Sequence, residues 1–207
     1  MRKKGRKRKK SFLKFVLVIL LFGVLLYFIL FIVKKQTNGE VSRIKNYDYL
    51  LERRDTKLME DNFNELNNIL QAKTVDYEKY AEYLSKLFII DLYTINNKDN
   101  RYDVGSVEYV YPEHKDNFIL KVSDTLYKYV EEKSKRKQKL PEVANIELKS
   151  IENTTYDYND NEYEAYQVVL TWDYIKDLGY DKTGEVTLMK IDDKLYVSEF
   201  IPKGLLS

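Results

Sequence analysis

The stretch that decides the fold is EVTLMKIDDKLYVSEFI, residues 185–201. Apolar and polar residues alternate on both sides of Asp192 and Asp193, as they do in strands that bury one face. Only these two residues separate the halves, and so short a connection joins antiparallel strands in a hairpin. We therefore expect strands over residues 185–191 and 194–201.

Two more strands are predicted before this hairpin. Apolar and polar residues alternate around Ile146 and again over residues 166–172. Segments rich in Asn, Asp and Gly separate the strands, at residues 154–162 and 179–185, and such segments form turns. Because consecutive strands joined by short turns pair antiparallel, the pattern predicts a four-stranded antiparallel meander.

A helix is predicted over about residues 74–95. Its apolar residues recur three or four positions apart, which is typical of a helix with a buried face. The run LFII at residues 87–90 implies burial on more than one side. The apolar positions are Tyr77, Tyr80, Ala81, Leu84, Leu87, Phe88 and Leu92.

The segment between this helix and the meander predicts a loop, a short strand and another helix. Residues 96–105, NNKDNRYDVG, are dense in Asn, Asp and Gly and end the first helix. Residues 107–111 suit a strand, and Pro112 suits the first turn of a helix whose apolar positions fall within 118–130. The basic run KSKRKQK, 133–139, complements the C-terminus of that helix. A patch for anionic wall polymer is the alternative interpretation of this run.

A transmembrane helix is predicted near the N-terminus. Residues 15–33 read FVLVILLFGVLLYFILFIV and carry no charge. At the rise of an α-helix they span roughly 29 Å, about one hydrocarbon core. A cleaved signal peptide has a shorter apolar region followed by small residues, whereas this run ends directly in Lys34 and Lys35. We expect a single anchoring span.

Basic residues are concentrated before and beside this span. Residues 1–35 hold 11 Lys and Arg and no acidic residue, whereas residues 36–207 hold 24 basic and 33 acidic residues. The positive-inside rule therefore places the basic tail, residues 1–14, in the cytoplasm and the chain after the span outside. The tail suits an anionic lipid leaflet, and specific nucleic-acid binding is not expected because no aromatic residues interrupt its charges. The expected location is the cell membrane.

A polar stalk is predicted after the span. Ile44, Leu51 and Leu66 are spaced as on one helix over residues 41–72. Charged residues interrupt this stripe, so a sustained coiled coil is not predicted. The expected organisation is a basic tail (1–14), a transmembrane helix (15–33), a juxtamembrane stalk helix (34–73) and an extracytoplasmic α+β domain (74–207).

The sequence lacks the residues that most catalytic and metal-binding sites need. Zero Cys and one His exclude thiolate nucleophiles, iron–sulfur clusters and multi-histidine metal sites. Residues 157–162, DYNDNE, match a calcium loop at three ligand positions, but Glu162 and Val168 stand where Gly and the closing Glu belong, so a hairpin turn is expected. His114, beside Glu113, is expected to be a solvated residue of a helical first turn. We expect no enzymatic activity and no cofactor.

The order of elements resembles the cone-shaped α+β fold of the nuclear transport factor superfamily, over about residues 74–202. The layout of a basic tail, one membrane helix and one such domain outside is similar to assembly factors of bacterial type IV secretion and to conjugation proteins of Gram-positive bacteria. The resemblance implies helices packed on a curved antiparallel sheet. It also implies a cavity, for which the candidate lining residues are Asp91, Tyr93, Tyr166 and Trp172.

Together these observations predict a non-enzymatic, membrane-anchored structural or interaction component of a bacterial cell-envelope complex. The most specific form of this prediction is that the complex is a secretion or conjugation machinery. The expected partners are membrane lipid, envelope proteins and copies of the chain itself. One alternative is a ligand-binding or sensory ectodomain with a closed, tyrosine-lined cavity. Another is a cone-fold enzyme with a buried carboxylate at that cavity. The 19 tyrosines suit a bacterium with an AT-rich genome. The absence of cysteine suits a domain that is exported to the cell-wall side of the membrane of such a bacterium.

Overall fold

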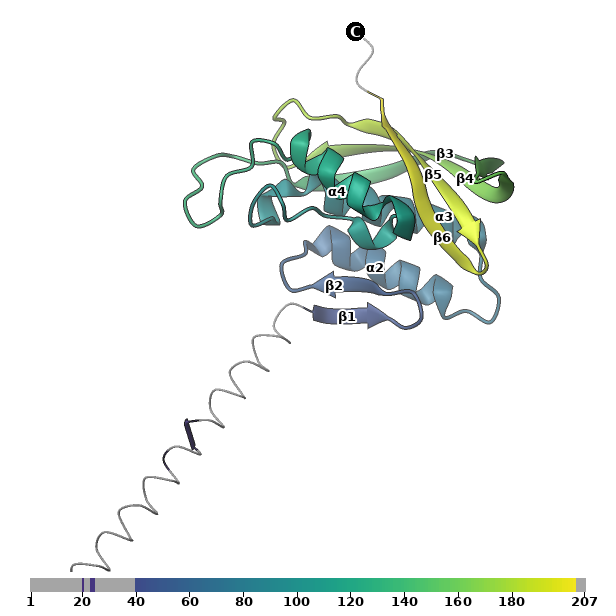
Figure 1. The fold of residues 1–207 in the computed structure, drawn as a ribbon, viewed down its shortest axis with the longest axis horizontal. Coiled ribbons are helices and arrows are strands. Elements are labelled where there is room, and N and C mark those ends of the chain that lie inside the picture. The colour runs from purple at the N-terminus through teal and green to yellow at the C-terminus, as the bar shows by residue number, and fades with distance from the viewer. Residues whose placement is uncertain (1–19, 21–22, 25–39, 204–207) are drawn as a thin grey trace, which may run out of the picture. The chain divides into compact units, whose positions relative to one another are not determined.

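A computed structural model describes residues 20, 23–24 and 40–203 of the chain. It is an α+β structure with antiparallel sheets, and residues 42–203 lie in one compact unit (Figure 1). Its elements are β1 (Glu40–Ile44), β2 (Tyr49–Glu52), α2 (Lys57–Leu70), α3 (Tyr77–Tyr93), η1 (Ile95–Asn97), η2 (Val107–Tyr109), η3 (Pro112–His114), α4 (Lys115–Asp124), β3 (Val143–Tyr158), β4 (Asn161–Tyr174), β5 (Thr183–Ile191) and β6 (Lys194–Pro202).

The predicted transmembrane helix, residues 15–33, lies outside the described residues except at Leu20, Gly23 and Val24. The basic tail, residues 1–14, lies outside them as well. Within the part of the chain that the structure describes, no helix is long and apolar enough to cross a membrane.

The antiparallel meander is confirmed, with strand order β3-β4-β5-β6. Its hairpins turn at Asn159 and Asp160 and at Asp192, which all have positive φ, as tight hairpin turns require. The first turn is shorter than predicted, because β3 continues to Tyr158 through residues expected to be turn. β3 is an edge strand whose polar residues face solvent, so its far half lacks the apolar alternation that marks a strand.

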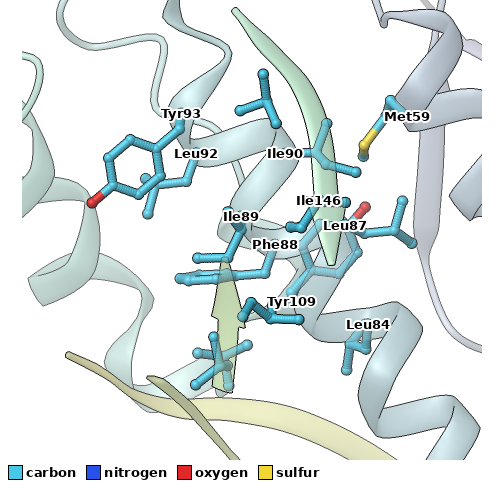
Figure 2. Close-up of a cluster of buried hydrophobic side chains, with 14 of the residues drawn as sticks. Met59, Leu84, Leu87, Phe88, Ile89, Ile90, Leu92, Tyr93, Tyr109 and Ile146 are labelled. Atoms are coloured by element: carbon cyan, nitrogen blue, oxygen red, sulfur yellow. The ribbon is translucent and has the colours of Figure 1, made fainter. Parts of the chain in front are cut away.

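The predicted helix over residues 74–95 is confirmed as α3, which is the centre of the core. The Asp76 side chain caps its N-terminus by accepting a hydrogen bond from the Lys79 N–H at 3.1 Å. The helix contacts all four strands of the meander and also α2, so it is buried on several sides. Figure 2 shows α3 side chains meeting Met59 of α2 and Ile146 of β3. Its buried residues are Tyr80, Ala81, Leu84, Ser85, Leu87, Phe88, Ile89, Ile90, Leu92 and Tyr93.

The prediction of one stalk helix over residues 41–72 is wrong. Its first part is a hairpin, β1–β2, and only α2 is helical. Asn46 and Asp48 adopt positive φ in the turn, which interrupts any helix, and these residue types tolerate that conformation well. Tyr49 and Leu51 are buried while their neighbours are half-buried, which is the alternation of a strand. The hairpin and α2 pack on the rest of the domain, and so they are part of its core.

Two smaller predictions are also wrong. Residues 107–111 form the 3-10 helix η2 followed by a single bridge between Val110 and Val197. The helix after Pro112 ends at Asp124, and so the basic run 133–139 does not follow a helix C-terminus. Arg136 of this run instead donates hydrogen bonds to several backbone carbonyls of the preceding loops.

The Tyr49 hydroxyl joins the hairpin to the core, and its loss should destabilise the fold. This buried hydroxyl lies 2.6 Å from the Tyr80 hydroxyl and donates to the Leu195 carbonyl at 3.2 Å. We expect Tyr49→Phe to lower the free energy of unfolding by roughly 1–2 kcal/mol, the usual effect of losing a buried hydrogen bond. Denaturant unfolding measures it, with Tyr129→Phe as control because Tyr129 is 76% exposed. Equal effects of both substitutions would contradict this role of Tyr49.

Candidate functional site

A groove lies between α4 and β6. Its volume is about 620 Å³, within the range of ligand-binding sites. Figure 1 shows α4 beside β6. One wall comes from α4 and the turn after it, the other from β6, and α3 supplies the floor. The residues that form these three surfaces are Phe118, Lys121, Val122, Thr125 and Leu126; Val197, Ser198, Glu199, Phe200 and Pro202; and Phe88, Leu92 and Tyr93.

Aromatic rings form the inner surface of the groove. The Phe88 ring of α3 lies 5.8 Å from the ring of Phe118 and 5.6 Å from that of Phe200, so it bridges the two walls. Phe118 and Phe200 are only half-buried, as is Leu126. The groove therefore presents apolar side chains to solvent from both walls. Contiguous apolar surface of this kind is typical of a site that another molecule covers.

Charged side chains line the rim and differ between the two walls. Lys121 extends from α4, while Glu199 lies on β6 and Asp181 in the loop before β5. Lys121 and Glu199 are exposed, whereas Asp181 is half-buried. The arrangement can orient a bound molecule by its charges or backbone dipoles, because polar groups around an apolar floor fix orientation.

A hydrogen-bonded network includes Tyr93 and Asp181 of the groove. The Tyr93 hydroxyl donates to the Asp181 carboxylate at 3.2 Å, and burial together with this carboxylate raises the pKa of Tyr93 well above its ordinary value. The Tyr174 hydroxyl donates to the Asp181 carbonyl at 2.5 Å and accepts from Trp172 Nε1 at 2.8 Å. Because these hydroxyls are committed to partners and stay protonated at neutral pH, the network is a structural support for the groove.

The four residues predicted to line one cavity are divided among three places. Tyr93 lines the groove, and Trp172 packs behind it with ring centroids 5.1 Å apart. Tyr166 is buried on β4, where its hydroxyl donates to Glu164 at 2.8 Å. Asp91 lines a different cavity, of about 240 Å³, beside β2.

His114 packs among aromatic rings, and the calcium-like segment is the end of a hairpin. The His114 ring packs edge-on against Tyr111 and Tyr158, at 5.4 and 5.1 Å, near the mouth of the groove. Residues 157–162 form the end of the β3–β4 hairpin. Among the described residues, no group of three or more His, Asp or Glu is arranged to hold a metal ion.

Comparison with known proteins gives no independent assignment, because no family model, curated protein or solved structure matches this chain.

Sequence reasoning missed the groove because its two walls are about 75 residues apart in the chain. Phe118 and Leu126 lie on the apolar face of the helix predicted after Pro112, and this position predicts burial against the core. Val197 belongs to the alternating apolar residues that predict the buried face of a strand, whereas Phe200 falls outside that alternation. The signal that was present is Pro202, which ends β6 and leaves Phe200 close to the free end of an edge strand.

Gly184 of β5 sets the position of the Phe200 ring. A β-carbon at Gly184 would lie 2.6 Å from Phe200 Cε2 and 3.2 Å from Trp172 Cη2, so the ring must move if the glycine is replaced. We expect Gly184→Ala to destabilise the protein by roughly 1–3 kcal/mol, as overpacking commonly does. Phe200→Leu should relieve the clash, giving a coupling of more than about 0.5 kcal/mol in a double-mutant cycle followed by denaturant unfolding. Additive effects of these two substitutions would show that the ring is placed by something else.

Proposed function

We propose that this chain is a non-enzymatic, membrane-anchored interaction component of a bacterial cell-envelope complex, and that the groove between α4 and β6 binds a protein partner. The observation that carries the proposal is the half-buried apolar pair Phe118 and Phe200, facing the same open groove from opposite walls. Interfaces of this type gain most of their affinity from aromatic anchors in a dry centre. The basic tail and the uncharged run at residues 15–33 support the membrane anchor.

The shape of the bound segment follows from the walls. β6 is the last strand of the sheet, and beyond its contact with Tyr111 no strand of the described chain covers its outer edge. An extended peptide can pair with such an edge while its side chains enter apolar pockets. An extended apolar segment of an envelope protein, or of another copy of this chain, is therefore the occupant that suits the groove.

The groove supports this reading better than a small-ligand receptor. A sensory ectodomain of the kind predicted as the alternative needs a closed, tyrosine-lined cavity. Along the groove only one tyrosine, Tyr93, contributes to the described lining, and its hydroxyl is already bonded to Asp181. Thr125 and Glu199 at the rim are exposed. The groove is therefore open to solvent and can accept one segment of a larger polypeptide chain.

The element order adds support from fold. Helices that pack on a four-stranded antiparallel meander are in keeping with a domain like those of the nuclear transport factor superfamily. A shared fold does not determine a function, so the proposal rests on the groove itself.

Two neighbouring positions on α4 provide a matched test. Lys121 lines the groove, whereas Leu120 is 61% exposed and does not line it. We expect a photoreactive amino acid at position 121 of the full chain, expressed in its own cells, to crosslink to one defined protein, and the same amino acid at position 120 to give no such product. Mass spectrometry of the product should map the crosslink to an apolar, extended segment.

The outcomes separate the proposals. Crosslinking to a lipid or a small molecule from position 121 alone would favour the ligand-binding alternative. Equal products from positions 120 and 121, or none from either, would contradict a partner site in the groove.

A further inference from the structure

A second cavity, separate from the groove, is lined mainly by charged side chains of the domain. It has a volume of about 240 Å³ and lies where the hairpin β1–β2 meets α3 and the loop before η2. Five carboxylates line it, together with one arginine, and Lys98 lies beside it with 1% of its surface exposed. The carboxylates are Glu52, Asp55, Asp91, Asp103 and Glu108. These acids outnumber the two cations by three.

Ion pairs account for three of the five carboxylates. Arg54 pairs with Glu52 at 2.5 Å and with Asp103, to which it donates two hydrogen bonds. Lys98 pairs with Asp91, which also accepts a hydrogen bond from the Ser106 backbone N–H. The two cations in the cluster are thereby committed to other acids.

Asp55 and Glu108 are the two carboxylates without an ion pair among the described residues. Their hydrogen bonds come from the hairpin backbone: the Glu52 N–H donates to Asp55 at 2.7 Å, and the Leu50 N–H donates to Glu108 at 3.3 Å. The bond to Glu108 crosses from β2 to η2. It therefore fastens the hairpin to the rest of the domain.

The charged groups that face these two acids come from every element around the cavity. Asp91 of α3 and Lys98, which follows η1, face both of them, and the two acids face each other across the cavity. Glu52 of β2 also faces Asp55, and the buried Tyr109 side chain of η2 faces Glu108, Asp91 and Asp55. Burial has the largest effect and raises the pKa of Glu108 to about 7 and that of Asp55 to about 6, with the negative charge of Asp91 acting in the same direction. Lys98 and the backbone donors oppose the change.

A proton is the ligand that suits this cavity. The described residues contain no cluster arranged for a metal ion, and the cations present are already paired. Protonation removes the surplus negative charge while a carboxylic acid still accepts the backbone hydrogen bonds through its carbonyl oxygen.

We propose that Glu108 and Asp55 form a proton-operated latch that holds the hairpin β1–β2 on the domain when they are protonated and loosens it when both are charged. This inference is independent of the groove and of its partner. The hairpin is the first described element of the compact unit in chain order, so the latch would change the structure at the start of this unit.

The direction of the pH effect follows from proton linkage. Both acids have a higher pKa in the closed state than in an opened, solvated one, so the closed state binds more protons at pH 5–6. The stabilisation is complete below their ordinary pKa values, near 4, and is lost as the pH rises through about 6 and 7. Opening of the hairpin should therefore become about tenfold or more easier between pH 5.5 and pH 7.5, because each unit of pKa difference corresponds to a factor of ten.

Hydrogen–deuterium exchange on the full chain in lipid nanodiscs tests the latch. Peptides covering residues 42–56 should lose about tenfold or more of their protection between pH 5.5 and 7.5, after correction for the intrinsic pH dependence of exchange. Peptides from β4 and β5 should not change. The double substitution Glu108→Gln and Asp55→Asn should abolish the pH dependence, because these amides stay neutral and still accept the backbone bonds, whereas Glu65→Gln on the exposed face of α2 should preserve it.

Three results would overturn the proposal. The first is hairpin protection in the wild-type chain that does not change with pH. The second is an equal change in the hairpin and the sheet, and the third is a pH dependence that persists in the folded double variant. The wild-type comparison alone decides the matter if the double variant does not fold.

Discussion

The burial of α3 on several sides is the constraint on which the rest of the structure depends. The helix lies against the inner face of the meander and also against α2, so its side chains need partners in almost every direction. This explains the run LFII at residues 87–90, which a helix with a single buried face would not carry. The meander packs on this helix, and so does the N-terminal part of the domain, which consists of β1, β2 and α2.

The two cavities are consequences of the same helix. Phe88, Leu92 and Tyr93 reach the groove, whereas Asp91 reaches the acidic cavity. Residues two positions apart lie roughly 200° apart around a helix, which explains why Tyr93 and Asp91 serve different sites although they are close in sequence. α3 therefore supplies the floor of a site suited to a partner and, on another side, the carboxylate that pairs with Lys98. The rigidity of a buried helix keeps both arrangements in place.

The parts of the fold that local patterns determine could be predicted from the sequence. The β5–β6 hairpin follows from alternation around Asp192 and Asp193, and α3 follows from its apolar spacing and the Asp76 cap. The β1–β2 hairpin could not be predicted, because its apolar residues Ile44, Tyr47 and Leu51 are spaced as they would be on one face of a helix. Tertiary contacts such as that of Tyr49 with Tyr80 decide between the two. The groove was missed for the same reason, since its walls are brought together only by folding.

The central claim, that a protein partner covers the groove between α4 and β6, is tested most directly by hydroxyl-radical footprinting. The oxidation of Phe118, Leu126 and Phe200 would be compared between the purified full chain and intact cells, with the exposed Tyr129 and Ile175 as references outside the groove. The account predicts that the three groove residues are protected in cells relative to the references. Equal oxidation of all five residues in both settings would contradict it.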